Sequence, residues 1–406
     1  MENPHPIVLF KRYNARLLGS LAALVVIAAA INVRVNPWRV LPNSVSDPKL
    51  DAFRDYSQRM RTGKAGLLRY GDYSVALVGS SRIANAFDPH LPEWQRDSVV
   101  NLGCSAAFLK ESVLIARNFI ESQPAQLLIL GVDPGDLTSE VDTRPLMDFP
   151  QSPFSPRSGI ENEISYWVGP SAVRSSFLTL QNARKREPAR YGPDGVPRSA
   201  RESLANQVAF IASTLENPNP LDTFDAAGPG RPLNCDKLKS LKELLQTAAQ
   251  HSCRVIILYH ASHALMHGQL EDRGNAIVPF ETERRTIVRL ISDHLQVFPE
   301  HSVAFWDFCN HHPLSCEPIP FDRPETGRLE NWRDLGHYRA VVGHQMLALM
   351  LGWLEPRPEW HDIGKVVTPR NLEAHLQEVA GDYQGYLNRT GIRDLEWKAK
   401  LRSGNR

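Results

Sequence analysis

Three short apolar runs, each closed by glycine or polar residues, constrain the fold of this chain more than any other feature. They are SVALVG (74–79), SVVNLG (98–103) and AQLLILGV (125–132). Continuous β-branched runs of this length are typical of strands that are buried on both faces of a parallel sheet. Two later runs, RVIILYH (254–260) and SVAFWDF (302–308), have the same form. The runs therefore predict five parallel strands.

Amphipathic helices are predicted between and after these strands. The segment after the second run places apolar residues at i, i+4, i+7 and i+11, on one helical face: Leu109, Val113, Ala116 and Ile120. Similar patterns predict helices at 236–251, 282–298 and 342–353, and a last one capped by Thr368 with Pro369 at its first position. Strands that alternate with helices predict an α/β protein with a doubly wound parallel sheet, in a flavodoxin-like arrangement of three layers.

An apolar run near the N-terminus predicts contact with a membrane. Leu17 to Val33 contains 17 residues without a charge, which is near the lower limit of about 17–25 residues for a membrane-spanning helix. Basic residues before the run favour a cytoplasmic N-terminus. The small residues Ala28 to Ala30 would also suit a cleavage site, so a signal peptide stays open as the alternative. In both cases we expect the chain from Arg34 onward outside the cytoplasm, on the periplasmic face of the inner membrane.

The spacing of these patterns suggests how the chain is divided. A stretch of about a hundred residues rich in turn signals, such as YGPDGVP and ENPNP, interrupts the alternation after the third strand. We interpret this stretch as an insertion. The expected parts are a cytoplasmic segment (1–16), a transmembrane anchor (17–33), a linker (34–70), an α/β domain (71–365) with an insertion at 136–234, and a C-terminal helix and tail (366–406).

Charge and motifs exclude several functional classes. The chain has 46 Lys and Arg against 45 Asp and Glu, a net charge of +1, so no basic excess indicates binding to nucleic acid. It has no phosphate-binding glycine loop and no zinc-protease motif, and we expect no cofactor and no metal. The stretch CNHHPLSC, Cys309 to Cys316, leaves a small-loop disulfide and a zinc site open as alternatives.

A serine at the end of the first strand suggests nucleophilic chemistry. The strand ends in Gly79-Ser80-Ser81-Arg82, at the sheet edge where ligands of parallel sheets gather. Serine needs a base to take its proton, and Asp334 and His337 stand three residues apart before a predicted helix. This spacing allows Asp334 to orient the imidazole while the other ring nitrogen faces Ser81. Helix capping is the alternative role for the two serines.

Taken in chain order, four short motifs resemble the blocks of the SGNH (GDSL-type) hydrolase superfamily. They are Gly-x-Ser after the first strand, Asn-x-Gly after the second, Gly-x-Asp after the third and Asp-x-x-His before a late helix. The resemblance covers about 74–133 and 300–355. It implies that Ser81 is the nucleophile and that Asp334 and His337 are its partners. It also implies that Gly103 donates its N–H to an oxyanion hole. The third block places Asp133 where the family supplies a second donor from asparagine.

GSSR, a single N-terminal anchor and a closing D-x-x-H-Y are similar to a narrower group, the membrane-anchored SGNH-like proteins that modify cell-envelope polymers outside the cytoplasm. This resemblance implies a serine acyltransferase or esterase that acts on O-acyl groups, acetyl foremost, of a polysaccharide. It further implies a membrane-bound O-acyltransferase as partner. The alternative is a non-catalytic scaffold of the same fold that binds the polysaccharide or the acyltransferase.

Other residues near the predicted strand ends have two open roles each. Arg82 would hold a substrate or lie in solvent on the first turn of a helix. His260 and His263 would line the cleft or have a structural role. Asp307 competes with Asp334 as partner of a catalytic histidine. Two aromatic residues that flank the Asp-x-x-His motif would stack on sugar rings or pack in a core: Trp332 and Tyr338.

Overall fold

The computed structural model describes residues 6–55, 57–142, 147–192, 194–197, 206–217, 232–270, 278, 280–353 and 360–403. The chain forms two compact units. The first, here called the helical unit, combines Met1–Gly71 with Met147–Arg198, and the second, the α/β unit, combines Asp72–Leu146 with Ser199–Arg406. Parts of the expected insertion 136–234, the first five residues of segment 1–16 and the last three of 366–406 lie outside the described residues.

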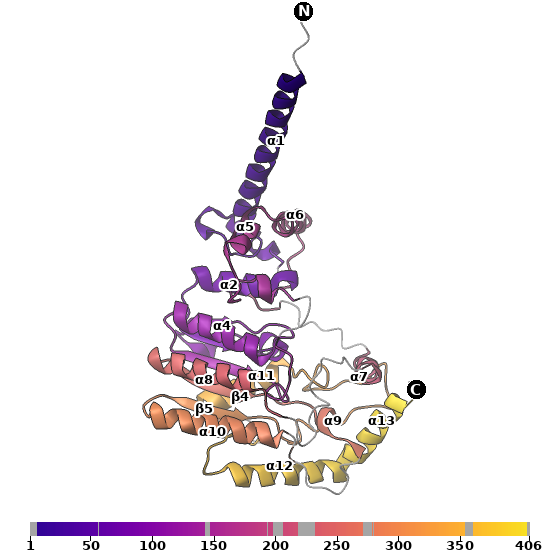
Figure 1. Cartoon of the computed structure of the whole chain (residues 1–406). Helices are drawn as coiled ribbons and strands as arrows, with labels where there is room; N and C mark the ends of the chain where they lie inside the picture. Colours follow the sequence, from indigo (N-terminus) through magenta and orange to yellow (C-terminus); the bar gives the residue numbers. More distant parts are fainter. Residues whose placement is uncertain are drawn as a thin grey trace, which may run out of the picture. The chain divides into compact units, whose positions relative to one another are not determined.

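The α/β unit contains a six-stranded sheet in the order β2-β1-β3-β4-β5-β6. Two of its strands, β4 and β5, are labelled in Figure 1. The sixth strand, β6 (Lys365–Val366), was not predicted and runs antiparallel to β5. The other five are parallel and fall on the five predicted runs. The α/β class and the parallel sheet expected from the sequence are thus confirmed. The five parallel strands are β1 (Val75–Val78), β2 (Val99–Asn101), β3 (Leu127–Val132), β4 (Arg254–Tyr259) and β5 (Val303–Asp307).

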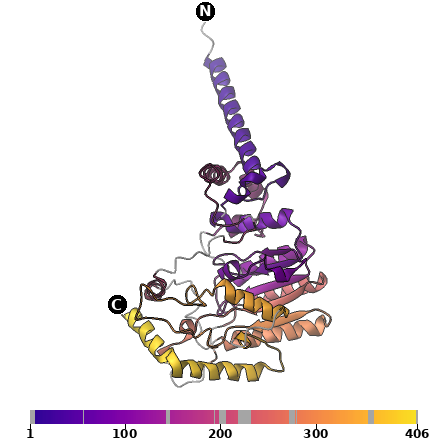
Figure 2. The same cartoon turned by 180° about the vertical axis from the view of Figure 1, so that it is seen from behind.

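Alternate residues along each strand face different layers of helices. Val75 and Leu77 of β1 join an apolar cluster with residues of α3 (Ser81–Ala86) and α11 (Ala340–Leu351). Successive strand side chains point to opposite faces, so Ala76 and Val78 face the other layer. That layer contains α4 (Leu109–Ser122), α8 (Cys235–Gln250) and α10 (Glu281–Val297), which pack side by side in this order. The two sides of the unit can be followed in Figures 1 and 2.

The C-terminal region belongs to the α/β unit. Two helices, α12 (Leu372–Tyr386) and α13 (Ile392–Ser403), are joined by a π-helical turn (Leu387–Gly391). Tyr383, Tyr386 and Leu395 are buried in the same apolar cluster as β1. The helix predicted from Pro369 begins instead at Leu372, because Thr368 starts a turn in which its carbonyl accepts from the N–H groups of Asn371 and Leu372.

The helical unit replaces the linker expected at 34–70. It contains α1 (Pro6–Val35), α2 (Met60–Tyr70), α5 (Ile160–Val168), α6 (Pro170–Lys185) and the short 3-10 helices Asn43–Val45, Pro48–Phe53, Ser57–Arg59 and Phe149–Gln151. Buried Asp148 accepts from the Arg61 N–H at 3.2 Å and from the Thr62 N–H and hydroxyl at 2.9 Å. This carboxylate satisfies free donors at the first turn of α2. The first half of the insertion therefore folds together with residues 34–70.

Helix α1 has the length and composition of either a single-pass anchor or a signal sequence. Phe10–Val35 has a mean hydropathy of 2.1. Its apolar side chains are exposed over most of its length, including Leu18, Leu24 and Val26. An exposed apolar helix of this size is suited to a bilayer, where every backbone polar group is satisfied within the helix.

Candidate active site

Ser81 is presented by a tight strand-to-helix turn. Strand β1 ends at Val78 and Ser81 is the first residue of α3. A side chain at Gly79 would place its Cβ 2.7 Å from Ile83 Cγ1, so the turn requires glycine. Ser80 is the N-cap, and its hydroxyl accepts from the Arg82 N–H at 3.3 Å. The capping role thus falls to Ser80, and the Ser81 hydroxyl is left for another partner.

Asp334 and His337 occupy the tip of a hairpin. Trp332 and Tyr338 form an antiparallel bridge at its base, and the Arg333 N–H donates to the His337 carbonyl at 2.8 Å. At the tip, Asp334 Oδ1 accepts from the N–H groups of Gly336 at 2.8 Å and His337 at 2.9 Å. These bonds hold the carboxylate in the orientation that it needs toward the imidazole.

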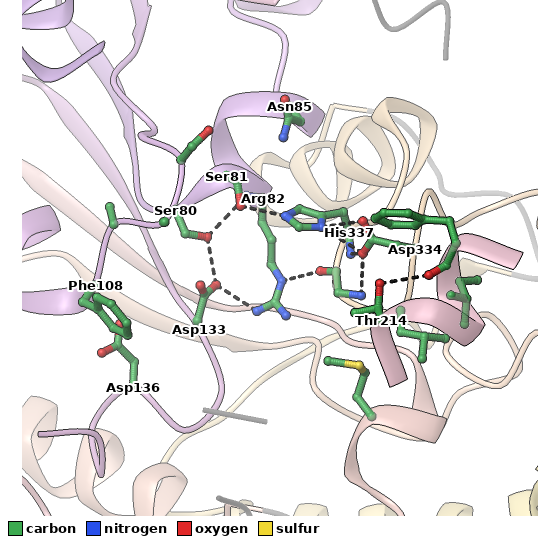
Figure 3. Close-up of a pocket in the computed structure, with 18 of the residues that line it drawn as sticks. Ser80, Ser81, Arg82, Asn85, Phe108, Asp133, Asp136, Thr214, Asp334 and His337 are labelled. Atoms are coloured by element: carbon green, nitrogen blue, oxygen red, sulfur yellow. Dashed lines mark hydrogen bonds and ion pairs between the residues drawn. The ribbon is translucent and has the colours of Figure 1, made fainter. Parts of the chain in front are cut away.

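The structure brings Ser81, His337 and Asp334 together in a hydrogen-bonded chain (Figure 3). His337 Nδ1 lies 2.9 Å from both carboxylate oxygens of Asp334, and His337 Nε2 lies 2.7 Å from Ser81 Oγ. With the Nδ1 proton directed at the carboxylate, Nε2 accepts from the serine hydroxyl. Burial raises the pKa of Asp334, whereas His337 and the hydrogen bonds lower it. The lowering effects are larger together, so the pKa of Asp334 lies below its usual value. This geometry is able to activate a serine for acyl transfer.

Arg82 is buried, and it links three parts of the site. It is 3% exposed. Its guanidinium donates to the Gly336 carbonyl at 2.6 Å, to Asp133 Oδ1 at 2.8 Å and to Ser262 Oγ at 3.1 Å. The solvated role considered from the sequence does not fit this position, because the side chain is buried and its guanidinium bonds three groups of the protein. Its contact with Gly336 positions the hairpin that carries His337.

The structure contradicts the expectation that Asp133 is an oxyanion donor. Asp133 Oδ1 accepts from Arg82 and, at 3.1 Å, from Ser80 Oγ. Burial raises the pKa of this carboxyl, whereas Arg82, His260 and the two hydrogen bonds lower it, with a net value below the usual one. An ionised carboxylate has no proton to donate. Asp133 therefore anchors Arg82.

Gly103 also differs from the expected oxyanion donor. Its N–H donates to Asn101 Oδ1 at 3.0 Å. A Cβ at Gly103 would lie 2.5 Å from the Ala84 backbone nitrogen, so glycine is required where β2 approaches α3. Asn101 in turn donates to the Ile83 and Phe87 carbonyls at the end of α3. The Asn-x-Gly motif therefore serves in this structure to fasten α3 to the sheet.

The remaining candidates have structural positions. His260 is buried, with Nδ1 2.7 Å from the Tyr338 hydroxyl, and burial lowers its pKa to about 3. His263 caps α9 (Ala264–His267) through the Leu265 N–H. Asp307 pairs with Arg284 and with His375 Nε2, at 2.5 and 2.7 Å, so its carboxylate is engaged away from His337.

The aromatic and cysteine residues near the site are also internal. Trp332 and Tyr338 are buried in the core of the α/β unit, so of their two open roles the structure shows core packing and not stacking on sugar rings. Cys309 and Cys316 are free thiols. Within the described ranges, no group of three His, Cys, Asp or Glu side chains is arranged to hold a metal ion.

A cavity of about 470 Å³ opens beside Ser81 and His337. It lies beyond the carboxyl ends of β1 and β3, where ligands bind in open parallel sheets. Its floor contains the hydrogen-bonded chain, and Asn85, four residues after Ser81 on α3, lies on the same helical face (Figure 3). Apolar side chains form much of its wall: Ala106, Ala107, Phe108, Phe210, Ile211, Leu215, Met266 and Leu335.

Helix α7 (Gln207–Glu216), from the second half of the insertion, is a part of the site that sequence reasoning missed. Buried Gln207 donates to the Trp332 and Arg333 carbonyls at 2.7 and 2.9 Å, directly before Asp334. Its side-chain oxygen accepts from the Leu329 N–H at 2.8 Å. The sequence did contain a signal, because Val208, Ile211 and Leu215 are spaced as one apolar helical face and are all buried.

Comparisons of the chain with protein-family models, with curated proteins and with solved structures found no match.

Proposed function

We propose that this protein is a membrane-anchored serine acyltransferase or esterase of the SGNH type, which acts on O-acyl groups of a polysaccharide outside the cytoplasm. The observation that carries the proposal is the chain Ser81–His337–Asp334 on the floor of a cavity at the carboxyl edge of the sheet. The order of the motifs supports the SGNH assignment. The polysaccharide and the acyltransferase partner follow from the family resemblance alone, and the orientation of the anchor follows from the basic residues before the apolar run.

The reaction divides into two transfers. Ser81 Oγ attacks the acyl carbonyl carbon while its proton passes to His337 Nε2, and the imidazolium is stabilised by Asp334. The protonated imidazole then donates to the leaving alcohol oxygen, and an acyl ester remains on Ser81. In the second transfer, water or a sugar hydroxyl attacks this ester and gives its proton to His337. The proton returns to Ser81 as the serine leaves.

The oxyanion would need donors other than Gly103 and Asp133. We assign this role to the Ser81 backbone N–H and to the side-chain amide of Asn85, which lines the cavity on the same helix. Loss of one such donor slows acyl transfer by about 100- to 1,000-fold. The change Asn85→Ala is therefore expected to slow acylation of Ser81 by this order without a change in fold.

A non-catalytic scaffold is the second candidate function. The observation in its favour is that neither expected donor is available: Asp133 is an ionised acceptor and the Gly103 N–H is held by Asn101. In that case the cavity would bind a polysaccharide or a membrane acyltransferase without turnover.

Covalent labelling separates the two candidates. The full-length chain in detergent is treated with an organophosphorus serine probe, and the adduct is mapped by mass spectrometry. The enzyme predicts one adduct per chain, on Ser81, which is absent in Ser81→Ala and forms at least about 100-fold more slowly in His337→Ala. His344→Ala, which changes a partly exposed histidine on α11, is the matched control and should label normally. A folded protein that stays unlabelled at Ser81 would favour the scaffold.

A further inference from the structure

The C-terminal end of α1 is embedded in the helical unit. Asn32 is 0% exposed, and α5 and α6 both contact α1. Asn32 Nδ2 donates to the Trp167 carbonyl on α5, and the Ser176 hydroxyl on α6 donates to Asn32 Oδ1, both at 2.8 Å. Figure 1 shows α5 and α6 beside the lower end of α1. Two helices therefore cover the last turns of the apolar run.

The length of the apolar run sets the depth of these helices once α1 crosses a membrane. The uncharged run between Arg16 and Arg34 has 17 residues, which corresponds to about 26 Å of helix. The hydrocarbon layer is about 30 Å thick. The whole run, Asn32 included, is thus needed to cross it. The helices that contact Asn32 must then lie at the boundary between hydrocarbon and head groups.

Helix α5 exposes an apolar stripe where that boundary would lie. Ile160, Ile164 and Trp167 are spaced at i, i+4 and i+7, so they share one face. Their side chains are 77%, 53% and 40% exposed. The opposite side of the helix packs inward, where the Tyr166 hydroxyl donates to the Gln151 carbonyl at 2.5 Å. Tryptophan at such a level is typical of membrane interfaces.

Helix α6 has the same two-sided character. Its small buried residues, Ala172, Ser176 and Thr179, form the inner face that includes the contact with Asn32. Its exposed apolar side chains are Phe177, Leu178 and Leu180, of which Phe177 is 69% exposed. Exposed basic residues accompany them: Arg174, Arg184 and Lys185. Aromatic and aliphatic side chains beside Lys and Arg are typical of helices that lie in the plane of a membrane interface.

We propose that α5 and α6 lie in the interfacial layer of the membrane that α1 crosses. The surface in contact with lipid, here called the lipid collar, consists of Ile160, Ile164, Trp167, Phe177, Leu178 and Leu180. Its continuity with the exposed apolar surface of α1 favours a bilayer as the occupant, and the basic residues of α6 favour anionic head groups. The inference rests on the anchor alone and does not use the chemistry at Ser81.

Depth-dependent quenching tests the lipid collar in the full-length protein. Cys235 is the exposed cysteine among five and is first replaced by serine. Single cysteines are then introduced at collar positions (Ile164→Cys and Phe177→Cys), in the span (Ile31→Cys) and at exposed polar positions of the same unit (Lys49→Cys and Glu187→Cys). Each carries an environment-sensitive fluorophore, and each chain is reconstituted alone in a nanodisc of phosphatidylethanolamine and phosphatidylglycerol.

Two quenchers distinguish the occupants. The collar labels are expected to emit at shorter wavelength than the control labels and to be quenched by shallow spin-labelled lipid about as strongly as the label at position 31. The control labels should be quenched by iodide in water. Collar labels quenched by iodide like the controls would overturn the proposal. Collar labels that neither quencher reaches would also overturn the proposal. Such labels would be covered by protein, either a partner or a second copy of the chain in the same disc. Normal labelling of Ser81 in the same samples shows that either failure is separate from the proposed function.

Discussion

Apolar side chains are usually buried and histidines are usually at least partly exposed. The two units depart from this pattern in different ways. The helical unit exposes the six apolar side chains of the lipid collar, whereas the described part of the α/β unit buries six histidines. Those histidines are His260, His263, His267, His294, His311 and His375. The one histidine of the helical unit, His5, lies outside the described residues. We therefore expect the stability of the helical unit to depend on lipid and that of the α/β unit to depend on pH.

The largest expected difference is loss of stability in acid. Burial lowers the pKa of His260 and His311 to about 3, of His263 to about 4 and of His267 well below its usual value. The pKa of a histidine in the unfolded chain is near 6.5. Below that pH the unfolded chain binds protons at these histidines, whereas the folded unit keeps them neutral. The stability that these four histidines contribute is thus fully present above about pH 6.5 and is lost as the pH falls below it. At pH 5 His260, His263 and His311 account for about 2 kcal/mol each, or about 6 kcal/mol for the three as an upper limit.

Urea unfolding at pH 7.5, 6.0 and 5.0, followed by short proteolysis and peptide mapping, measures this effect for each unit separately. The change His267→Phe should reduce the dependence in the α/β unit by about 1.4 kcal/mol per pH unit. A helical unit that lost stability in parallel with the α/β unit would remove the distinction between them.

The second prediction concerns Arg82. In Arg82→Met, Asp133 keeps a charge with no guanidinium beside it and Gly336 loses a donor. We expect the α/β unit to lose about 3 kcal/mol of unfolding free energy and Ser81 to label more slowly. Adding Asp133→Asn should recover part of the stability, because the unpaired charge is removed. The matched control is Arg285→Met, an exposed pair with Glu281 and Glu373 whose loss is worth less than about 1 kcal/mol. Equal effects of the two arginine changes would contradict the role given to Arg82.

The third prediction concerns Gln207. Gln207→Ala removes two bonds to the carbonyls before Asp334, with an expected loss of about 2 kcal/mol. We also expect the labelling rate of Ser81 to fall, because the hairpin tip is held less firmly. The control is Thr214→Ala on the same helix, whose hydroxyl bonds only within α7. If Gln207→Ala were destabilised but labelled at the normal rate, α7 would be a wall of the cavity without influence on His337.

The smallest effect is expected from Asn32. Asn32→Leu leaves the Trp167 carbonyl and the Ser176 hydroxyl without this partner, at a loss of about 1 kcal/mol. Amide hydrogen exchange should rise in peptides of α5 and α6 and stay unchanged in the α/β unit, and Ser81 should label normally. The isosteric Asn32→Asp would be less well tolerated, because it adds a buried charge. Increased exchange around β1 would show that the two units are not independent.

The parallel strands were predictable because β-branched runs of four to six residues carry their own signal. The contacts between distant segments that build the helical unit could not be predicted in this way. Asp148 caps a helix whose Thr62 lies 86 residues earlier, and no local pattern reports such a contact. Strand β6 has only two residues, too few for any periodicity. Helix α7 carried an apolar stripe, but the turn signals around it favoured an irregular insertion.

In the site, the placement of Ser81, Asp334 and His337 followed from strand ends and spacing, and their catalytic role stays a prediction. Gly103 and Asp133 have partners in the structure that their predicted oxyanion role did not anticipate, and the reason is shared. A motif specifies which residue stands at a position, but the partner of its N–H or carboxylate comes from another segment. Asn101 and Arg82 are those partners.

The contacts of Asn32 also set an order of events during synthesis. Its partners on α5 and α6 follow it by 135 and 144 residues. At translation rates of about 5–20 residues per second, the first of these partners is synthesised roughly 7–27 s after Asn32. During that interval α1 has already left the ribosome with the amide unpaired, and the first three strands are made before α5 exists. The helical unit therefore completes its folding late, around a helix α1 that was synthesised early.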